Sequence, residues 1–187
     1  MKREELEHLI RAAGAITESR RLLVIGSAAI LGAHPDTPCE AARSTEASLV
    51  PLDHPERADL ISGALGELSP FHDTFGYYAE GVDLKTAILP QGWEGRLVPI
   101  DTFRTNGHVG LCLEIHDLFI SKLVAGREKD LEFCQAVVRA GLVDREVLLE
   151  RLKATPIGGD LREVVEARIS RWLKPSSDST PSVYPSP

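Results

Sequence analysis

Residues 20–32 (RRLLVIGSAAILG) place two apolar runs on either side of a Gly-Ser pair. The first run, 22–25, is short and aliphatic, which predicts a buried strand. The second run, 28–31, predicts a helix of small residues that begins directly after the pair. A strand that ends at Gly26 and Ser27 and opens into a helix presents backbone N–H groups and a hydroxyl, which together favour a phosphate group. A simple tight turn has the same residues, so this segment alone leaves both interpretations open.

Strand and helix signals alternate through the first half of the chain, and the second half is helical. An amphipathic first helix is expected to end near Gly14, and a helix over 56–68 to begin after Asp53. Short apolar or aromatic runs predict strands at 22–25, 45–50, 75–82, 86–89 and 96–100. Apolar residues at helical spacing predict helices over 116–125, 128–140, 144–153 and 160–173, the last one capped by Asp160 with Glu163.

This order predicts an α+β fold in which a mixed sheet is flanked by helices and followed by a helical C-terminal part. We expect an α/β core over residues 1–110 and a helical part over 111–173. Residues 174–187 are rich in Pro and Ser and cannot bury a core, so we expect a disordered tail there.

Charge and cysteine content exclude several classes of protein. The formal net charge of -7 argues against duplex DNA as the main partner, because phosphate backbones bind Lys and Arg. The three cysteines, Cys39, Cys112 and Cys134, lack the spacing of a disulfide framework or a zinc ribbon, so reduced thiols are expected. The N-terminus has no signal-peptide core, and no apolar run is long enough to span a membrane. We therefore expect a cytoplasmic protein with no membrane association.

Four segments together resemble the nucleotidyltransferase superfamily related to DNA polymerase beta: GSAAILG, STEASLVP, ADLISGALGELSPFHDTFGYYAEGV and LEIHDLFISKLVAGREKD. The likeness is closest to a bacterial nucleotidyltransferase-like family of uncharacterised role, akin to the AbiEii-type toxins of toxin–antitoxin systems. It covers residues 22–144, and its most specific part is KLVAGREKD at 122–130. The resemblance implies a nucleotidyltransferase-like core and a nucleoside triphosphate as ligand.

The resemblance also implies a set of carboxylates. In the superfamily, a D-x-D pair on the strand after the Gly-Ser turn holds Mg²⁺ against the triphosphate, because residues two apart on a strand share a face. Glu46 stands at the first of these positions, and Ser48 stands at the second. A third carboxylate belongs on a later strand. Asp73, Glu80 and Asp83 are candidates, and Glu80 is favoured because FGYYAEGV has the pattern of that strand.

The leading hypothesis assigns roles by this resemblance. Gly26, Ser27, Arg43, Arg127 and Asp130 would bind the nucleotide, and Glu46, Glu80 and Lys122 would be catalytic. Glu46 and Glu80 would also hold Mg²⁺, and the reaction would be nucleotidyl transfer. Each residue has a structural alternative: Lys122 can snorkel from the core, Arg127 and Asp130 can pair on a solvated helix face, and Arg43 can be exposed.

Two rival hypotheses stay open. A serine hydroxyl is a poor Mg²⁺ ligand beside a carboxylate, so Ser48 favours a catalytically inactive binding module, which could partner an antitoxin or another protein. In the second rival, the chain is a plain α/β scaffold whose Gly-Ser turn binds nothing. That hypothesis predicts that the candidate residues do not converge on one cleft.

Overall fold

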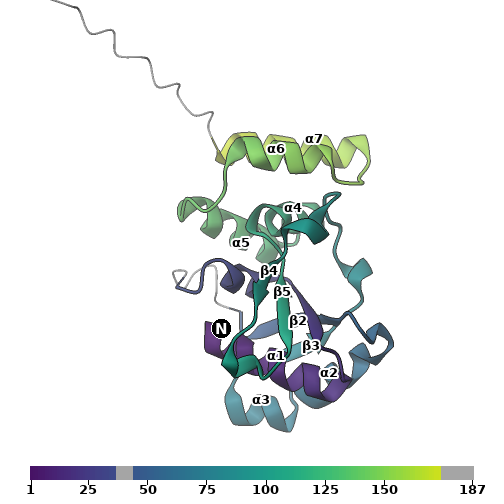
Figure 1. The fold of residues 1–187 in the computed structure, drawn as a ribbon. Coiled ribbons are helices and arrows are strands. Elements are labelled where there is room, and N and C mark those ends of the chain that lie inside the picture. Colours follow the sequence, from purple (N-terminus) through teal and green to yellow (C-terminus); the bar gives the residue numbers. More distant parts are fainter. Residues whose placement is uncertain (37–43, 174–187) are drawn as a thin grey trace, which may run out of the picture.

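The computed structural model describes residues 1–36 and 44–173 and places a five-stranded mixed sheet at the centre of the molecule (Figure 1). The strands are β1 (Arg21–Ile25), β2 (Glu46–Pro51), β3 (Tyr78–Gly81), β4 (Val98–Ile100) and β5 (Val109–Cys112), in the order β3-β2-β1-β5-β4. β1 pairs antiparallel with β2 and parallel with β5. β2 pairs parallel with β3, and β4 pairs antiparallel with β5. The predicted mixed sheet of an α+β fold is confirmed.

Helices cover the sheet and extend from one end of it. Helices α1 (Arg3–Thr17), α2 (Ala58–Leu65) and α3 (Pro70–Phe75) lie at one end of the molecule. Helices α4 (Ile115–Ala125) and α5 (Glu128–Arg139) lie at the opposite end, and α6 (Arg145–Lys153) and α7 (Gly159–Trp172) form an outer layer beyond them (Figure 1). The predicted helical C-terminal part is therefore present, and the structure places it at one end of the sheet.

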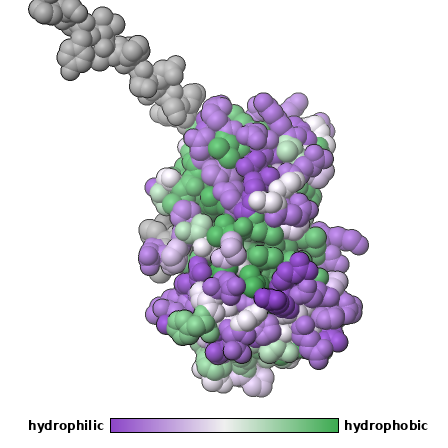
Figure 2. All heavy atoms as spheres, viewed as in Figure 1, coloured by the Kyte–Doolittle hydropathy of each residue, from purple (hydrophilic) through white to green (hydrophobic). Residues whose placement is uncertain are grey.

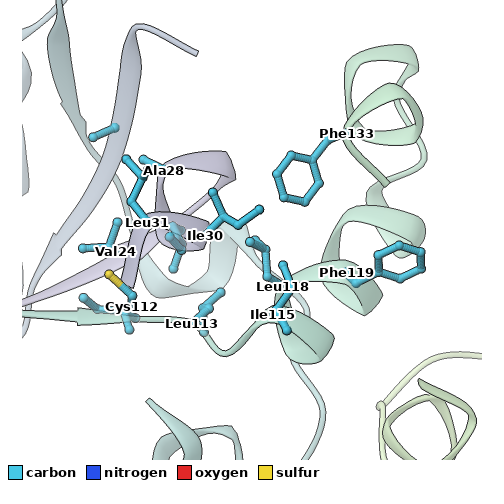
Figure 3. Packing of buried hydrophobic residues seen from close by; sticks show 14 of the residues in the cluster. Val24, Ala28, Ile30, Leu31, Cys112, Leu113, Ile115, Leu118, Phe119 and Phe133 are labelled. Atoms are coloured by element: carbon cyan, nitrogen blue, oxygen red, sulfur yellow. The ribbon is translucent and has the colours of Figure 1, made fainter. Parts of the chain in front are cut away.

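The short helix after the Gly-Ser pair joins these two parts. It is a 3-10 helix, η1 (Ser27–Gly32), whose residues 28–31 are all buried. Its side chains lie between those of the sheet and those of the C-terminal helices: Ile30 stands between Val24 and Leu118 (Figure 3). One continuous apolar core therefore runs from the strands through η1 into α4 and α5. Figure 2 shows hydrophobic residues gathered at the middle of one face, between the two ends of the molecule.

Several predicted elements are wrong in position or kind. Helix α1 continues past Gly14 to Thr17, and the segment 86–89 is no strand. Residues 84–86 instead form a 3-10 turn that Asp83 caps by accepting from the N–H of Lys85. Of the predicted strand 75–82, only Tyr78–Gly81 forms a strand, and Phe75 is the last residue of α3, which Ser69 caps and which has Pro70 in its first turn.

Strand β5 was not predicted, and it crosses the expected boundary at residue 110. Gly110 lies at its centre, where an added Cβ would stand 2.4 Å from Cδ1 of Ile10 on α1. Glycine removes the side-chain pattern that identifies a strand, although here it permits the close approach of helix and sheet. Helix α7 also differs from the prediction: its N-cap is Gly158, so Asp160 and Glu163 are not a capping pair.

Two of the three cysteines lie in the described residues, and both are free and buried. Burial raises the pKa of the Cys112 thiol to about 12 and raises the pKa of Cys134 as well. The expected reduced, structural thiols are confirmed at these two positions, whereas Cys39 lies outside the described residues. Within the described ranges, no helix has both the length and the apolar character needed to cross a membrane.

Candidate functional site

A cleft of about 780 Å³ lies between the strands β1 and β2 on one side and the helices α4 and α5 on the other. Its walls come from segments that are far apart in the chain. They include four basic side chains, Lys122, Arg127, Lys129 and Arg139, and two acidic ones, Glu46 and Glu132. The described part of the cleft is therefore basic in a chain whose net charge is -7, a distribution that favours an anionic ligand.

Gly26 and Ser27 form one corner of the cleft. Gly26 has φ 78°, a backbone conformation that glycine adopts without strain. A Cβ at this position would lie 3.2 Å from Oγ of Ser48 on the neighbouring strand. The small-residue helix expected at 28–31 is present as the six-residue 3-10 helix η1, and so short a helix contributes little macrodipole at its N-terminus. This corner of the cleft therefore presents the backbone of Gly26, which has no side chain, and the hydroxyl of Ser27.

Glu46 and Ser48 of β2 line the next part of the wall. They are two residues apart and share a face, while Ala47 and Leu49 point into the core. The Ser48 hydroxyl donates a hydrogen bond to Oε1 of Glu46 at 3.3 Å. Tyr78 is the register partner of Glu46 on β3. Its pKa is raised by burial first, and then by the negative charge of Glu46 and a hydrogen bond to that carboxylate.

Glu80 stands on the same face of the sheet but is turned away from the cleft. It is the register partner of Ser48. Its Oε1 accepts a hydrogen bond from the backbone N–H of Glu67 at 3.1 Å, in the connection between α2 and α3. The described residues that line the cleft include Glu46 but not Glu80. Glu80 therefore lies beside the cleft wall, and its hydrogen bond holds it to the loop between α2 and α3.

The helical wall is organised around one buried carboxylate. Asp130 is fully buried and accepts from Nζ of Lys122 at 2.8 Å and from Nε of Arg127 at 2.6 Å. Burial alone raises the pKa of Asp130, but the hydrogen bonds from Arg127 and Lys122 outweigh this effect and hold it below its usual value. Asp130 itself does not line the cleft among the described residues. It lies behind the two cations and orients them.

The two cations differ in exposure. The Lys122 side chain is 13% exposed and its Nζ lies 5.7 Å from the centroid of the Phe133 ring, whereas the Arg127 side chain is 63% exposed. The hydrogen bond to Asp130 is the main cause that raises the pKa of Arg127, and the charge of Glu46 adds to it. The negative charge of the strand wall therefore acts on a cation of the helical wall.

The side chains do not fit the two-metal site that the resemblance implies. Among residues 1–36 and 44–173, no group of three or more His, Cys, Asp or Glu side chains is placed to hold a metal ion. Where the superfamily has a second carboxylate, Ser48 presents a neutral hydroxyl, and a hard dication prefers anionic oxygen. Mg²⁺ binding by Glu46 and Glu80 stays a prediction.

The structure brings five candidate residues to one cleft: Gly26, Ser27, Glu46, Lys122 and Arg127. Arg43 lies outside the described residues. Sequence reasoning missed most of the α5 wall, which contains Lys129, Glu132, Phe133, Ala136 and Arg139. These residues recur at three- and four-residue spacing, so helical periodicity places them on one face and was the signal available.

Two histidines near the cleft-bearing elements have structural roles. Nδ1 of His72 accepts from the N–H of Leu68 at 3.1 Å, so it caps a loop. His116 belongs to the cap of α4, where its Nδ1 lies 2.7 Å from Oε1 of Glu114. Its Nε2 accepts from the N–H of Asp144, which ties α4 to the start of α6.

A mixed sheet with a Gly-Ser end, a carboxylate on the next strand and a basic helical wall is the arrangement expected of a nucleotidyltransferase-like protein. Residues 4–167 match the model of the family described as nucleotidyltransferase of unknown function (DUF6036), and the chain belongs to this family. Comparison with curated proteins and with solved structures found no match. The match covers both the sheet and the C-terminal helices, which together build the cleft.

Proposed function

We propose that this protein binds a nucleoside triphosphate in the cleft between β2 and α4–α5. The observation that supports this proposal is the convergence of Gly26 and Ser27 with Lys122 and Arg127, which lie about a hundred positions apart in the sequence. A local excess of basic side chains in an acidic protein attracts an anion of high charge. The plain-scaffold hypothesis predicts dispersed residues, which is the opposite arrangement.

The two cations have complementary properties for binding phosphates. Arg127 is exposed and carries a planar fork that can bind two phosphate oxygens at once. Lys122 is a more enclosed point charge whose direction is fixed by Asp130. Ile88 and Phe133 supply apolar surface in the same cleft, which suits the base of the nucleotide. The phosphates would therefore lie between Ser27 and the helical wall.

Nucleotide binding is tested by calorimetry of the full chain with ATP, GTP, CTP and UTP, each with and without Mg²⁺. We expect saturable binding of at least one nucleotide, and about tenfold weaker binding for Arg127→Ala because one charge-assisted contact is lost. Arg171→Ala removes a charge from an exposed position of α7 and serves as the matched control, with unchanged affinity. Absence of binding for all four nucleotides at millimolar concentration would end the proposal.

A second candidate function is a catalytically inactive binding module, and Ser48 favours it. Only one carboxylate of the strand pair is present, so the charge that holds catalytic metal ions is reduced. The Ser48→Asp variant then gains Mg²⁺ affinity, which a metal titration would detect. Robust transfer of label to an added acceptor by the native chain would contradict this candidate. An antitoxin as the partner of such a module stays a prediction from the resemblance.

A further inference from the structure

The Ser48 hydroxyl occupies an unusual place for a strand residue. It lines the cleft, lies against Gly26 and donates a hydrogen bond to the Glu46 carboxylate at 3.3 Å. The residue is partly exposed, so a ligand in the cleft can reach it. A hydroxyl that is hydrogen-bonded to a carboxylate is the arrangement of a nucleophile and its general base.

We propose that the acceptor of the nucleotidyl group is Ser48 itself, so that the protein becomes covalently nucleotidylated in its own cleft. This inference rests on the proposed function, because the bound nucleoside triphosphate is the donor. A reactive hydroxyl at Ser48 explains why the second position of the strand pair lies in the cleft although it carries no carboxylate. The residue that departs from the superfamily pattern is then the reactive one.

The transfer needs no reactant other than the protein and the bound nucleoside triphosphate. Oγ of Ser48 attacks the α-phosphorus, and the bond between that phosphorus and the oxygen bridging to the β-phosphate breaks. The hydroxyl proton passes to the Glu46 carboxylate, and pyrophosphate leaves. The product is a phosphodiester whose single phosphate joins Oγ of Ser48 to the nucleoside.

Residues on both walls serve this step. Tyr78 is the register partner of Glu46 on β3 and stands beside that carboxylate, which makes Tyr78 a positioning residue. On the opposite wall, Lys122 and Arg127 face the charge that develops on the departing pyrophosphate. The open backbone at Gly26 lets the α-phosphate approach Ser48, since a Cβ there would meet its Oγ at 3.2 Å.

The test incubates the full chain with nucleoside triphosphates labelled at the α-phosphorus or at the γ-phosphorus, in buffer that contains Mg²⁺. Modification is then located by peptide mass spectrometry of the native protein. We expect label from the α-position, none from the γ-position, and a nucleoside monophosphate on the peptide that contains Ser48. Label from the γ-position would overturn the inference, because it indicates phosphoryl transfer.

Matched variants separate a reactive serine from a structural one. Ser48→Ala abolishes the label, whereas Ser170→Ala, which removes an exposed hydroxyl from α7 outside the cleft, retains it. Glu46→Gln slows labelling by about 100-fold through loss of the general base. Tyr78→Phe slows it to a smaller degree and shifts its pH profile, while nucleotide affinity stays the same.

Nucleotide binding and covalent labelling are measured separately, so either one can be absent without the other being misread. A chain that binds nucleotide in calorimetry but stays unlabelled, or is labelled at another residue, overturns the inference and leaves nucleotide binding intact. A chain that binds no nucleotide overturns both.

Discussion

The two walls of the cleft are built in different ways. The strand wall, with Gly26, Glu46 and Ser48, takes its geometry from strand pairing and from the alternation of side chains along β2. The helical wall takes its geometry from the ion pairs of Lys122 and Arg127 with the buried carboxylate of Asp130. Backbone pairing therefore sets the geometry of the strand wall, whereas the Asp130 side chain sets the directions of the two cations in the helical wall.

This difference predicts which substitutions destabilise the protein. A substitution on the strand wall changes the chemistry of the cleft but leaves the paired strands in place. Loss of Asp130 leaves Lys122 nearly enclosed without its counter-ion, and such an unpaired buried charge is costly.

Asp130→Ala should have the largest effect. We expect the free energy of unfolding to fall by about 3 kcal/mol, because removing one partner of a buried ion pair leaves the other uncompensated. Urea denaturation measures the loss. Asp160→Ala, at an exposed position of α7, is the control and should change stability by less than about 0.5 kcal/mol. Equal stability of the two variants would refute the central role of Asp130.

Gly26→Ala tests the strand wall. The positive φ and the nearby Ser48 side chain predict a loss of about 1–2 kcal/mol from backbone strain. Gly63→Ala, in helix α2 with ordinary φ and open space around it, should be neutral or stabilising by up to about 1 kcal/mol. Thermal unfolding of both variants checks the contrast. A loss at Gly63 as large as that at Gly26 would show that the corner is not special.

The pH dependence of stability tests the helical wall without changing its shape. The pKa of Asp130 is lowered in the folded protein, so its ionised form stabilises the fold at pH values above its unfolded pKa of about 3.9. This contribution is lost as the pH falls through the lower, folded-state pKa. Urea denaturation of the native chain and of Asp130→Asn between pH 7 and pH 3 should therefore show a stability difference that narrows below about pH 4. A difference that stays constant would contradict the assigned ion pairs.

Arg127→Ala should have the smallest effect on stability. Its side chain is mostly exposed, so its ion pair with Asp130 contributes at most about 1 kcal/mol. Nucleotide affinity should nevertheless fall, as the calorimetric comparison with Arg171→Ala measures. A variant that loses stability like Asp130→Ala would show that Arg127 belongs to the structural core of the wall.

The sequence predicts the strand wall well because its signals are local. The short aliphatic run before Gly26 predicts its strand directly, and strand geometry puts Glu46 and Ser48 on one face once the resemblance singles them out. The orientation of Glu80 could not be predicted in this way, since it is set by the backbone N–H of Glu67 in a distant turn. Strand β5 escaped prediction because Gly110 interrupts its pattern, and its pairing with β1 is a tertiary contact.

The prediction of the helical-wall residues depended on the family resemblance more than on helical periodicity. Lys122 and Arg127 stand out in KLVAGREKD, but the burial of Asp130 beneath both of them requires the packing of α4 against α5. A charge cluster at this spacing predicts a solvated face equally well. Packing therefore decides which of the two interpretations applies.

The most direct test is a crystal structure of the full chain with a non-hydrolysable nucleoside triphosphate. The predicted result places the triphosphate between Ser27 on the strand wall and Lys122 and Arg127 on the helical wall. A second, more open hollow of about 530 Å³ lies beside Arg20 and Arg21 at the other end of β1. A nucleotide bound there, with the cleft between the two walls empty, would contradict nucleotide binding by Ser27, Lys122 and Arg127.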